Sequence, residues 1–223
     1  MRFLLVFILL SLTLKSQNFY YPGDVWVEKT PESQGLNSKK LLNAIEFAKS
    51  NENSVEKDLR IAILKSFGRE PGYKIKGPTK KRGDANGLII KNGYIVGRWG
   101  DTDRVDMTFS VTKSYLSTVA GIAHDKKLIS VKDKLKDYIW DGKFDDPHNS
   151  QISWHHLLNQ SSQWSGELFG THDWADRPPR GLSIEEIKKQ KLLPPGKAYK
   201  YNDVRVNLLS YSLLNVFRKP LPV

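Results

Sequence analysis

The segment 87–99 constrains the fold of this chain most strongly. Two β-rich runs lie on either side of the dipeptide Asn92-Gly93. Both central residues of a two-residue hairpin turn need a positive φ, which Asn-Gly accepts readily, so this pattern predicts a β-hairpin. From residue 111 onward, apolar residues recur at helical spacing instead. We therefore predict an α+β chain, in which a mostly helical domain joins an incomplete antiparallel sheet formed by N-terminal hairpin strands.

The helical pattern occurs in several further segments. The spacing of apolar residues predicts a buried helix from Val111 to Ala123, and other helices over 38–49, 131–139, 152–158, 183–190 and 204–216. Residues 59–67 fit either a strand or a helix end. Residues 70–86 are polar and rich in glycine, which predicts a long loop.

The first 16 residues have the pattern of a secretory signal peptide. A basic start at Arg2 precedes the apolar stretch from Phe3 to Leu14, and polar sequence follows. Twelve helical residues cover about 18 Å, which is short of the roughly 30 Å core of a bilayer. We therefore predict a periplasmic or secreted protein with no membrane span after signal removal; a retained N-terminal anchor is the alternative. Residues 17–35 then form an aromatic, turn-rich N-terminal arm.

Charge and cysteine content exclude several classes of protein. The 35 Lys and Arg outnumber the 24 Asp and Glu, which gives a formal charge of +11. These basic residues are scattered, and no nucleic-acid-binding motif accompanies them, so we expect no nucleic acid as a partner. The absence of cysteine excludes disulfide scaffolds, thiolate zinc sites and a cysteine nucleophile.

A Ser-x-x-Lys sequence at the start of the most apolar helix is the leading candidate for chemistry. Ser110 and Lys113 are three residues apart, so on a helix both side chains project to one face. The amine can take the hydroxyl proton only if burial lowers its pKa. A second match at Ser54 and Lys57 lies in a solvated stretch, and the alternative role for Ser110 is that of a helix N-cap.

Two downstream segments complete a resemblance to a known family. Residues 194–203 end in Tyr201-Asn202-Asp203 before an apolar helix, and residues 152–162 contain Trp-His-His-Leu-Leu-Asn-Gln-Ser-Ser. With Ser110 and Lys113 upstream, the chain from Leu36 to its C-terminus resembles the serine β-lactamase and penicillin-binding-protein superfamily, closest to its class C β-lactamase and esterase-like branch.

The resemblance implies a role for each matching residue. Ser110 is the acylated nucleophile, Lys113 is its proton partner, and Tyr201 moves protons through the second step. Tyr199 is the fallback for Tyr201, and both could instead be packed aromatics. Asp203 stands where the family usually has asparagine, and its negative charge would keep Lys113 protonated.

The same resemblance places substrate-binding residues beside the nucleophile. These are Asp203 and Asn202. Trp164 is a further candidate from the sequence alone, near a loop that either lines a substrate cleft or packs against the rest of the protein. The chemistry needs no cofactor and no metal. The adjacent histidines His155 and His156 point about 100° apart on a helix, so they cannot clamp one metal ion.

The family's third motif, a Lys-Thr-Gly or His-x-Gly strand, does not follow Tyr201, and Lys91-Asn92-Gly93 precedes the serine. We therefore expect residues 36–223 to be a β-lactamase-like domain truncated at its C-terminus, and the chain to be the N-terminal part of a longer one. The predicted function is that of a monomeric serine hydrolase acting through an acyl-enzyme on amide, ester or β-lactam bonds of a small molecule or peptide. The alternative is a catalytically silent binding protein of the same fold that recognises cell-wall peptides.

Overall fold

The computed structural model describes residues 20–70, 73–75 and 77–221, so the predicted signal peptide lies outside the described residues. The chain divides into two compact units, Met1–Val55 with Gly83–Val105 and Glu56–Arg82 with Asp106–Val223. None of the helices in the described ranges is long and apolar enough to cross a bilayer.

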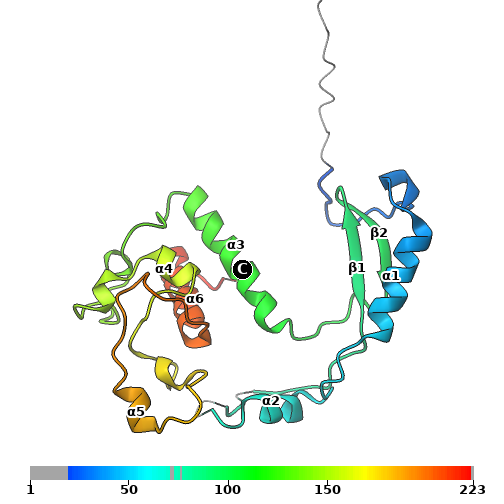
Figure 1. The fold of residues 1–223 in the computed structure, drawn as a ribbon. Coiled ribbons are helices and arrows are strands. Elements are labelled where there is room, and N and C mark those ends of the chain that lie inside the picture. The colour runs from blue at the N-terminus through cyan, green and yellow to red at the C-terminus, as the bar shows by residue number, and fades with distance from the viewer. Residues whose placement is uncertain (1–19, 71–72, 76, 222–223) are drawn as a thin grey trace, which may run out of the picture. The chain divides into compact units, whose positions relative to one another are not determined.

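The predicted hairpin is the centre of the first unit. Strands β1 (Gly87–Lys91) and β2 (Tyr94–Trp99) pair antiparallel, with a register shift between Ile89 and Ile90 (Figure 1). The turn residues Asn92 and Gly93 have φ values of 53° and 84°, as the primed hairpin turns require. The hairpin prediction is confirmed.

Helix α1 (Ser38–Ser50) lies along this hairpin (Figure 1). Its N-cap is Asn37, whose side chain accepts a hydrogen bond from the backbone N–H of Lys40. A Cβ at Gly97 of β2 would lie only 3.3 Å from Cδ1 of Ile45, so this glycine permits close packing of the helix on the strand. The N-terminal arm joins the same strand, because the N–H of Lys29 donates to the carbonyl of Ile95 over 2.9 Å.

The second unit begins with helix α2 (Leu59–Phe67), so the ambiguous segment 59–67 is helical. Asp58 caps it by accepting hydrogen bonds from the N–H groups of Arg60 and Ile61. The described residues of 70–86 contain neither a helix nor a strand, apart from a single bridge between Lys81 and Asp58, which agrees with the predicted loop.

Four helices and a small hairpin make up the rest of this unit. They are α3 (Thr112–Asp125), α4 (Trp154–Leu158), strands β3 (Glu167–Leu168) and β4 (Thr171–His172), α5 (Ile184–Lys188) and α6 (Asp203–Phe217). Short 3-10 turns lie in this unit at Phe109–Val111, Leu135–Asp137, Asn149–Gln151 and Asp173–Ala175, and in the first unit at Glu32–Gln34. Serine begins both short helices through a capping box, Ser153 with His156 in α4 and Ser183 with Glu186 in α5.

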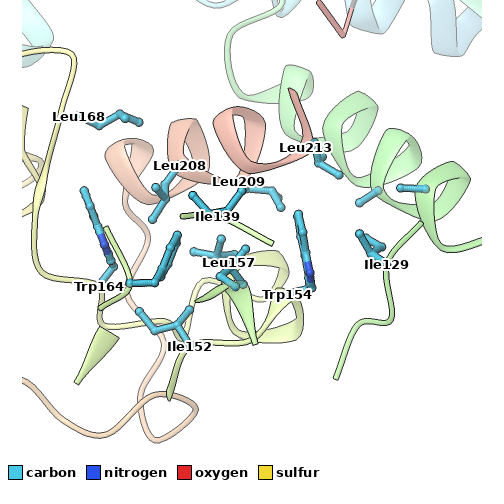
Figure 2. Close-up of a cluster of buried hydrophobic side chains, with 14 of the residues drawn as sticks. Ile129, Ile139, Ile152, Trp154, Leu157, Trp164, Leu168, Leu208, Leu209 and Leu213 are labelled. Carbon is cyan, nitrogen blue, oxygen red and sulfur yellow. The ribbon is translucent and has the colours of Figure 1, made fainter. Parts of the chain in front are cut away.

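The hydrophobic core of the second unit lies between α4 and α6 and extends to α3. Figure 2 shows Leu208, Leu209 and Leu213 of α6 above Trp154 and Leu157, with Trp164 at one end. Trp154 and Leu208 are fully buried. Burying a large apolar side chain contributes roughly 1.5–3 kcal/mol, so this cluster is the main source of the unit's stability.

Two helix predictions need correction. Residues 131–139 form only the 3-10 turn Leu135–Asp137, because the N–H of Leu135 donates to the carbonyl of Ile152 in another segment. The apolar spacing there reflects burial of Leu135 and Ile139 in the core. Helix α3 is not buried on all sides: Ala120 and Ala123 face the core, whereas the Tyr115 side chain is 64% exposed.

Candidate active site

Ser110 lies in the 3-10 turn that leads directly into α3. Its hydroxyl makes no helix-capping hydrogen bond, so the structure does not give it the N-cap role. The preceding residue, Phe109, has a φ of 47°, a conformation that non-glycine residues adopt at a cost of about 1–3 kcal/mol. The strained residue therefore directly precedes the serine that the sequence singled out.

The structure brings the three predicted catalytic side chains together. The Ser110 Oγ lies 2.5 Å from the hydroxyl oxygen of Tyr201, although the two residues are 91 positions apart. The Nζ of Lys113 donates to the same Oγ over 3.2 Å. It also lies 4.7 Å from the centre of the Tyr201 ring. The tyrosine in contact with Ser110 is thus Tyr201, and the Tyr199 side chain is exposed.

Lys113 is held in its charged form by Asp203. Partial burial of Lys113 disfavours the charge, but the contact of its Nζ with Oδ1 of Asp203, at 2.6 Å, outweighs this effect and raises the pKa of Lys113. The amine is therefore a cation at neutral pH. This corrects the requirement for an uncharged amine, and it agrees with the effect expected from an aspartate at position 203.

The Tyr201 hydroxyl loses its proton more readily than the Lys113 ammonium does, because the pKa of Tyr201 is lowered and that of Lys113 is raised. Burial alone would raise the pKa of Tyr201, but the interactions with Lys113 and Ser110 favour the phenolate and lower the pKa below its ordinary value. A phenolate at this place can accept a proton from Ser110 over a single short hydrogen bond. Both side chains contact the Oγ, and the opposite directions of their pKa shifts make Tyr201 the easier of the two to deprotonate.

Arg177 is a member of this site that the sequence analysis missed. Its Nη2 lies 2.8 Å from Oδ2 of Asp203, and its Nη1 lies 2.7 Å from Oδ1 of Asp176. The guanidinium centre is 4.6 Å from the centre of the Tyr201 ring. No motif marks this arginine, because only the folded loop brings it to the start of α6.

Charges of opposite sign therefore alternate through the site, from Asp176 to Arg177, Asp203 and Lys113. Burial opposes the charge on Asp203, but its ion pairs with Lys113 and Arg177 hold the pKa of this carboxyl below its ordinary value. Burial of Asp176 raises its pKa instead. The backbone N–H of Asp203 donates to the Asp176 carboxylate, which ties the loop to the start of α6.

Two predicted substrate-binding residues are structural. Asn202 is fully buried, and its side chain caps α6 by accepting from the N–H of Arg205. Trp164 is 1% exposed, packs in the hydrophobic core and donates from Nε1 to the carbonyl of Lys143. Neither side chain is exposed to a substrate in the structure, and for Trp164 this agrees with the packing alternative. Of the predicted substrate-binding residues, only Asp203 lies beside Ser110 and Lys113.

A buried ion pair anchors the loop that carries Arg177. The Nη2 of Arg205 in α6 lies 2.8 Å from Oδ2 of Asp173, and both side chains are almost completely buried. The amide of Asn202 donates to the backbone carbonyl of Asp173 over 2.8 Å. These contacts fix the loop against the first turn of α6, two residues from Tyr201.

The histidines do not form a metal site. The Nδ1 of His156 accepts from the N–H of Ser153, and the ring of His155 contacts the amide of Asn159. Within the described ranges, no group of three or more His, Asp or Glu residues is arranged to hold a metal ion.

The sequence of this chain matches a known protein family. A family model described as Beta-lactamase matches residues 81–222, which include Ser110, Lys113 and Tyr201. The chain belongs to the β-lactamase family. This confirms the predicted superfamily and its α+β fold class, although the match begins later than the predicted boundary at Leu36.

One solved structure that is similar to the chain is a protein of Bacillus anthracis assigned as a 6-aminohexanoate-dimer hydrolase. The sequences are 14% identical, the TM-score is 0.38, and the similarity covers 59% of this chain. This chain spans 40% of the length of that protein. No curated protein matches the sequence significantly.

Proposed function

We propose that this member of the β-lactamase family is a serine hydrolase that forms an acyl-enzyme at Ser110. The observation that carries the proposal is the position of the Ser110 Oγ, which lies within hydrogen-bond distance of both the Tyr201 hydroxyl and the Lys113 amine. A nucleophile in contact with a base, which is in turn oriented by a third group, is the usual arrangement for covalent catalysis.

In the acylation step, the Tyr201 phenolate accepts the hydroxyl proton while the Ser110 Oγ bonds to the carbonyl carbon of the substrate. The tetrahedral intermediate collapses, and the leaving group takes the proton from Tyr201. In the second step, Tyr201 accepts a proton from water, the hydroxide attacks the acyl carbon, and the proton returns to Ser110. The Lys113 ammonium stabilises the phenolate in both steps by its charge.

The position of Ser110 before α3 supports this role. Backbone N–H groups at the start of a helix carry partial positive charge, which stabilises negative charge that develops on the Oγ. The substrate class we propose is an amide, ester or β-lactam of a small molecule or peptide.

One observation favours a second candidate, a silent binding protein for cell-wall peptides. The contact between Asp203 and Lys113 keeps the amine protonated, so Lys113 cannot serve as the base. If Tyr201 also keeps its proton at neutral pH, Ser110 has no base within contact distance.

Active-site labelling distinguishes the two candidates. We expect a fluorophosphonate or penicillin probe to add one adduct to the full chain, detected by intact mass spectrometry, and to leave Ser110→Ala unlabelled. Equal labelling of both proteins, or none of either, would refute Ser110 as a nucleophile. A Ser54→Ala variant should label like the wild type, because it removes the serine of the second Ser-x-x-Lys sequence.

We also propose export to the periplasm or the medium through the apolar segment 1–16, and a monomeric exported protein. N-terminal sequencing of protein recovered outside the cytoplasm tests the cleavage near Ser16, and light scattering of the same sample gives the oligomeric state.

A further inference from the structure

A pocket lies beside the candidate active site, and the proposed acyl transfer does not use it. Its volume is about 440 Å³, within the range of about 300–1,000 Å³ that is usual for small-molecule sites. Asp203 and Arg177 line one wall of it. The same Asp203 contacts Lys113, which donates to Ser110, so a single ion pair separates the pocket from the nucleophile.

The other walls of the pocket are mostly apolar and come from segments far apart in the sequence. Ile63 and Phe67 lie on α2, Leu168 and Phe169 lie at the β3–β4 hairpin, and Val204 lies on α6. Apolar walls beside a few fixed polar groups are typical of a pocket that binds an apolar part of a ligand and orients it.

Among the described residues that line the pocket, the formal charges balance once Lys113, which pairs with Asp203, is counted with them. Arg177 pairs with Asp176 and Asp203, and Asp203 also pairs with Lys113, so the two acids and two bases balance. Glu70, whose carboxylate accepts from the backbone N–H of Arg177, and Lys74 also line the pocket, and their formal charges cancel. A charged substituent would therefore lose hydration without gaining a counter-ion.

The backbone at Phe169 supplies an independent observation. Phe169 and Gly170 form the two-residue turn of the β3–β4 hairpin, with φ values of 52° and 76°. Asparagine or glycine is the favoured first residue of such a turn, whereas a bulky aromatic residue is strained there. The Phe169 side chain is nonetheless 68% exposed and lines the pocket. Strain at an exposed aromatic residue of a pocket is a sign of a binding role.

We propose that this pocket, with Phe169 at its rim, binds an uncharged apolar substituent of the ester or amide that Ser110 cleaves. The inference rests on the proposed hydrolase function for its link to Ser110. The substrate would then carry an alkyl or aryl group next to the scissile bond. Asp203 lines the pocket and contacts Lys113, which donates to Ser110, so the pocket lies close to the nucleophile.

The pocket can be filled without disturbing the core. Asn207 lines the pocket and is exposed on α6, so Asn207→Trp adds bulk to the pocket from an exposed position. Asn215→Trp is the matched control, because Asn215 is exposed on the same helix and does not line the pocket. Phe169→Asn removes the aromatic rim and places in the turn a residue that accepts a positive φ.

The test measures kcat/KM of the full chain on two ester series: p-nitrophenyl esters from acetate to hexanoate, and acetate esters of alcohols from methanol to hexanol. At about fourfold for each buried methylene, we expect kcat/KM to rise by about 250-fold over the four methylenes of the acyl series, or by about 1,000-fold over the five methylenes of the alcohol series, for the series whose alkyl group enters the pocket. Asn207→Trp and Phe169→Asn should flatten that rise, and Asn215→Trp should keep it. A flat dependence in both series, or a rise that all variants keep, would overturn the proposal.

A binding measurement separates this inference from the hydrolase function. The neutral fluorophore N-phenyl-1-naphthylamine should bind wild type and Ser110→Ala equally and bind Asn207→Trp at least tenfold more weakly. Binding of this kind without hydrolysis of any ester would refute the hydrolase and retain the pocket. Hydrolysis with equal fluorophore binding by Asn207→Trp and Asn215→Trp would refute the pocket and retain the hydrolase.

Discussion

Asp203 contacts Lys113 through one carboxylate oxygen at 2.6 Å and uses the other oxygen to bind Arg177. This relationship decides which group can act as the base at Ser110. It raises the pKa of Lys113, so the proposed mechanism gives the proton of Ser110 to Tyr201, whose hydroxyl also contacts the Oγ.

Tyr201→Phe tests the assignment of the base. Loss of a general base typically lowers a rate by about 10²- to 10⁴-fold, so we expect that loss in the rate of fluorophosphonate labelling. Tyr199→Phe is the control, because its exposed ring lies two residues away in the same loop. Equal labelling rates for the two variants would show that Tyr201 does not take the proton.

Asp203→Asn tests the electrostatic role of the aspartate. Its negative charge raises the pKa of both Lys113 and Tyr201. Replacement by the neutral amide should lower both pKa values, so the rise of ester hydrolysis with pH should occur at lower pH than in the wild type. The measurement is kcat/KM as a function of pH.

Asp141→Asn is the matched control for that shift. Asp141 pairs with Lys143 at 2.7 Å, a similar ion pair whose contacts in the described part of the chain do not include Ser110, Lys113 or Tyr201. This variant should keep the pH profile of the wild type. An unchanged profile in Asp203→Asn would contradict the role that we give to the aspartate.

The pH dependence of stability should also depend on Asp203. Its pKa is lower in the folded chain than in the unfolded chain, so its contribution is present above the ordinary pKa and is lost as the pH falls through the folded value. The Asp203 side chain is 42% exposed, which limits the contribution to about 1 kcal/mol. The difference in free energy of unfolding between wild type and Asp203→Asn should shrink as the pH falls below 4; a constant difference would contradict the linkage.

The buried pair of Asp173 and Arg205 should stabilise the loop at the site. Asp173→Ala leaves the Arg205 charge buried without its partner, so we expect a loss of about 3–5 kcal/mol in urea unfolding. Asp173→Ala with Arg205→Met should cost less than the sum of the two single variants. The exposed pair of Lys49 and Glu46 is the reference, for which Glu46→Ala should cost at most about 1 kcal/mol. A strictly additive double variant would refute the coupling.

The sequence predicted the elements whose pattern is local. The Asn92-Gly93 turn and the spacing of Ser110 and Lys113 depend on neighbours within a few residues, and the structure contains both. The pairing of Tyr201 with Ser110 came from the family resemblance, because no local rule joins residues 91 positions apart.

The errors have a common physical cause. Asn202 and Trp164 have side chains that suit either a substrate or the interior, and residue type alone does not distinguish these environments. Arg177 was missed for the converse reason: its partner Asp203 is 26 positions away in the sequence and comes beside it only after the loop packs on α6. The helix predicted over 131–139 failed because tertiary hydrogen bonding overrode local periodicity.

The short contact between Ser110 and Tyr201 joins distant parts of the sequence, so the reactivity of Ser110 would report on folding. The two hydroxyls lie 91 positions apart in the sequence and meet only when the segment that leads into α6 has docked beside the start of α3. Reactivity of the serine toward an activity-based probe would therefore develop late in folding, after the leucines of α6 have entered the core.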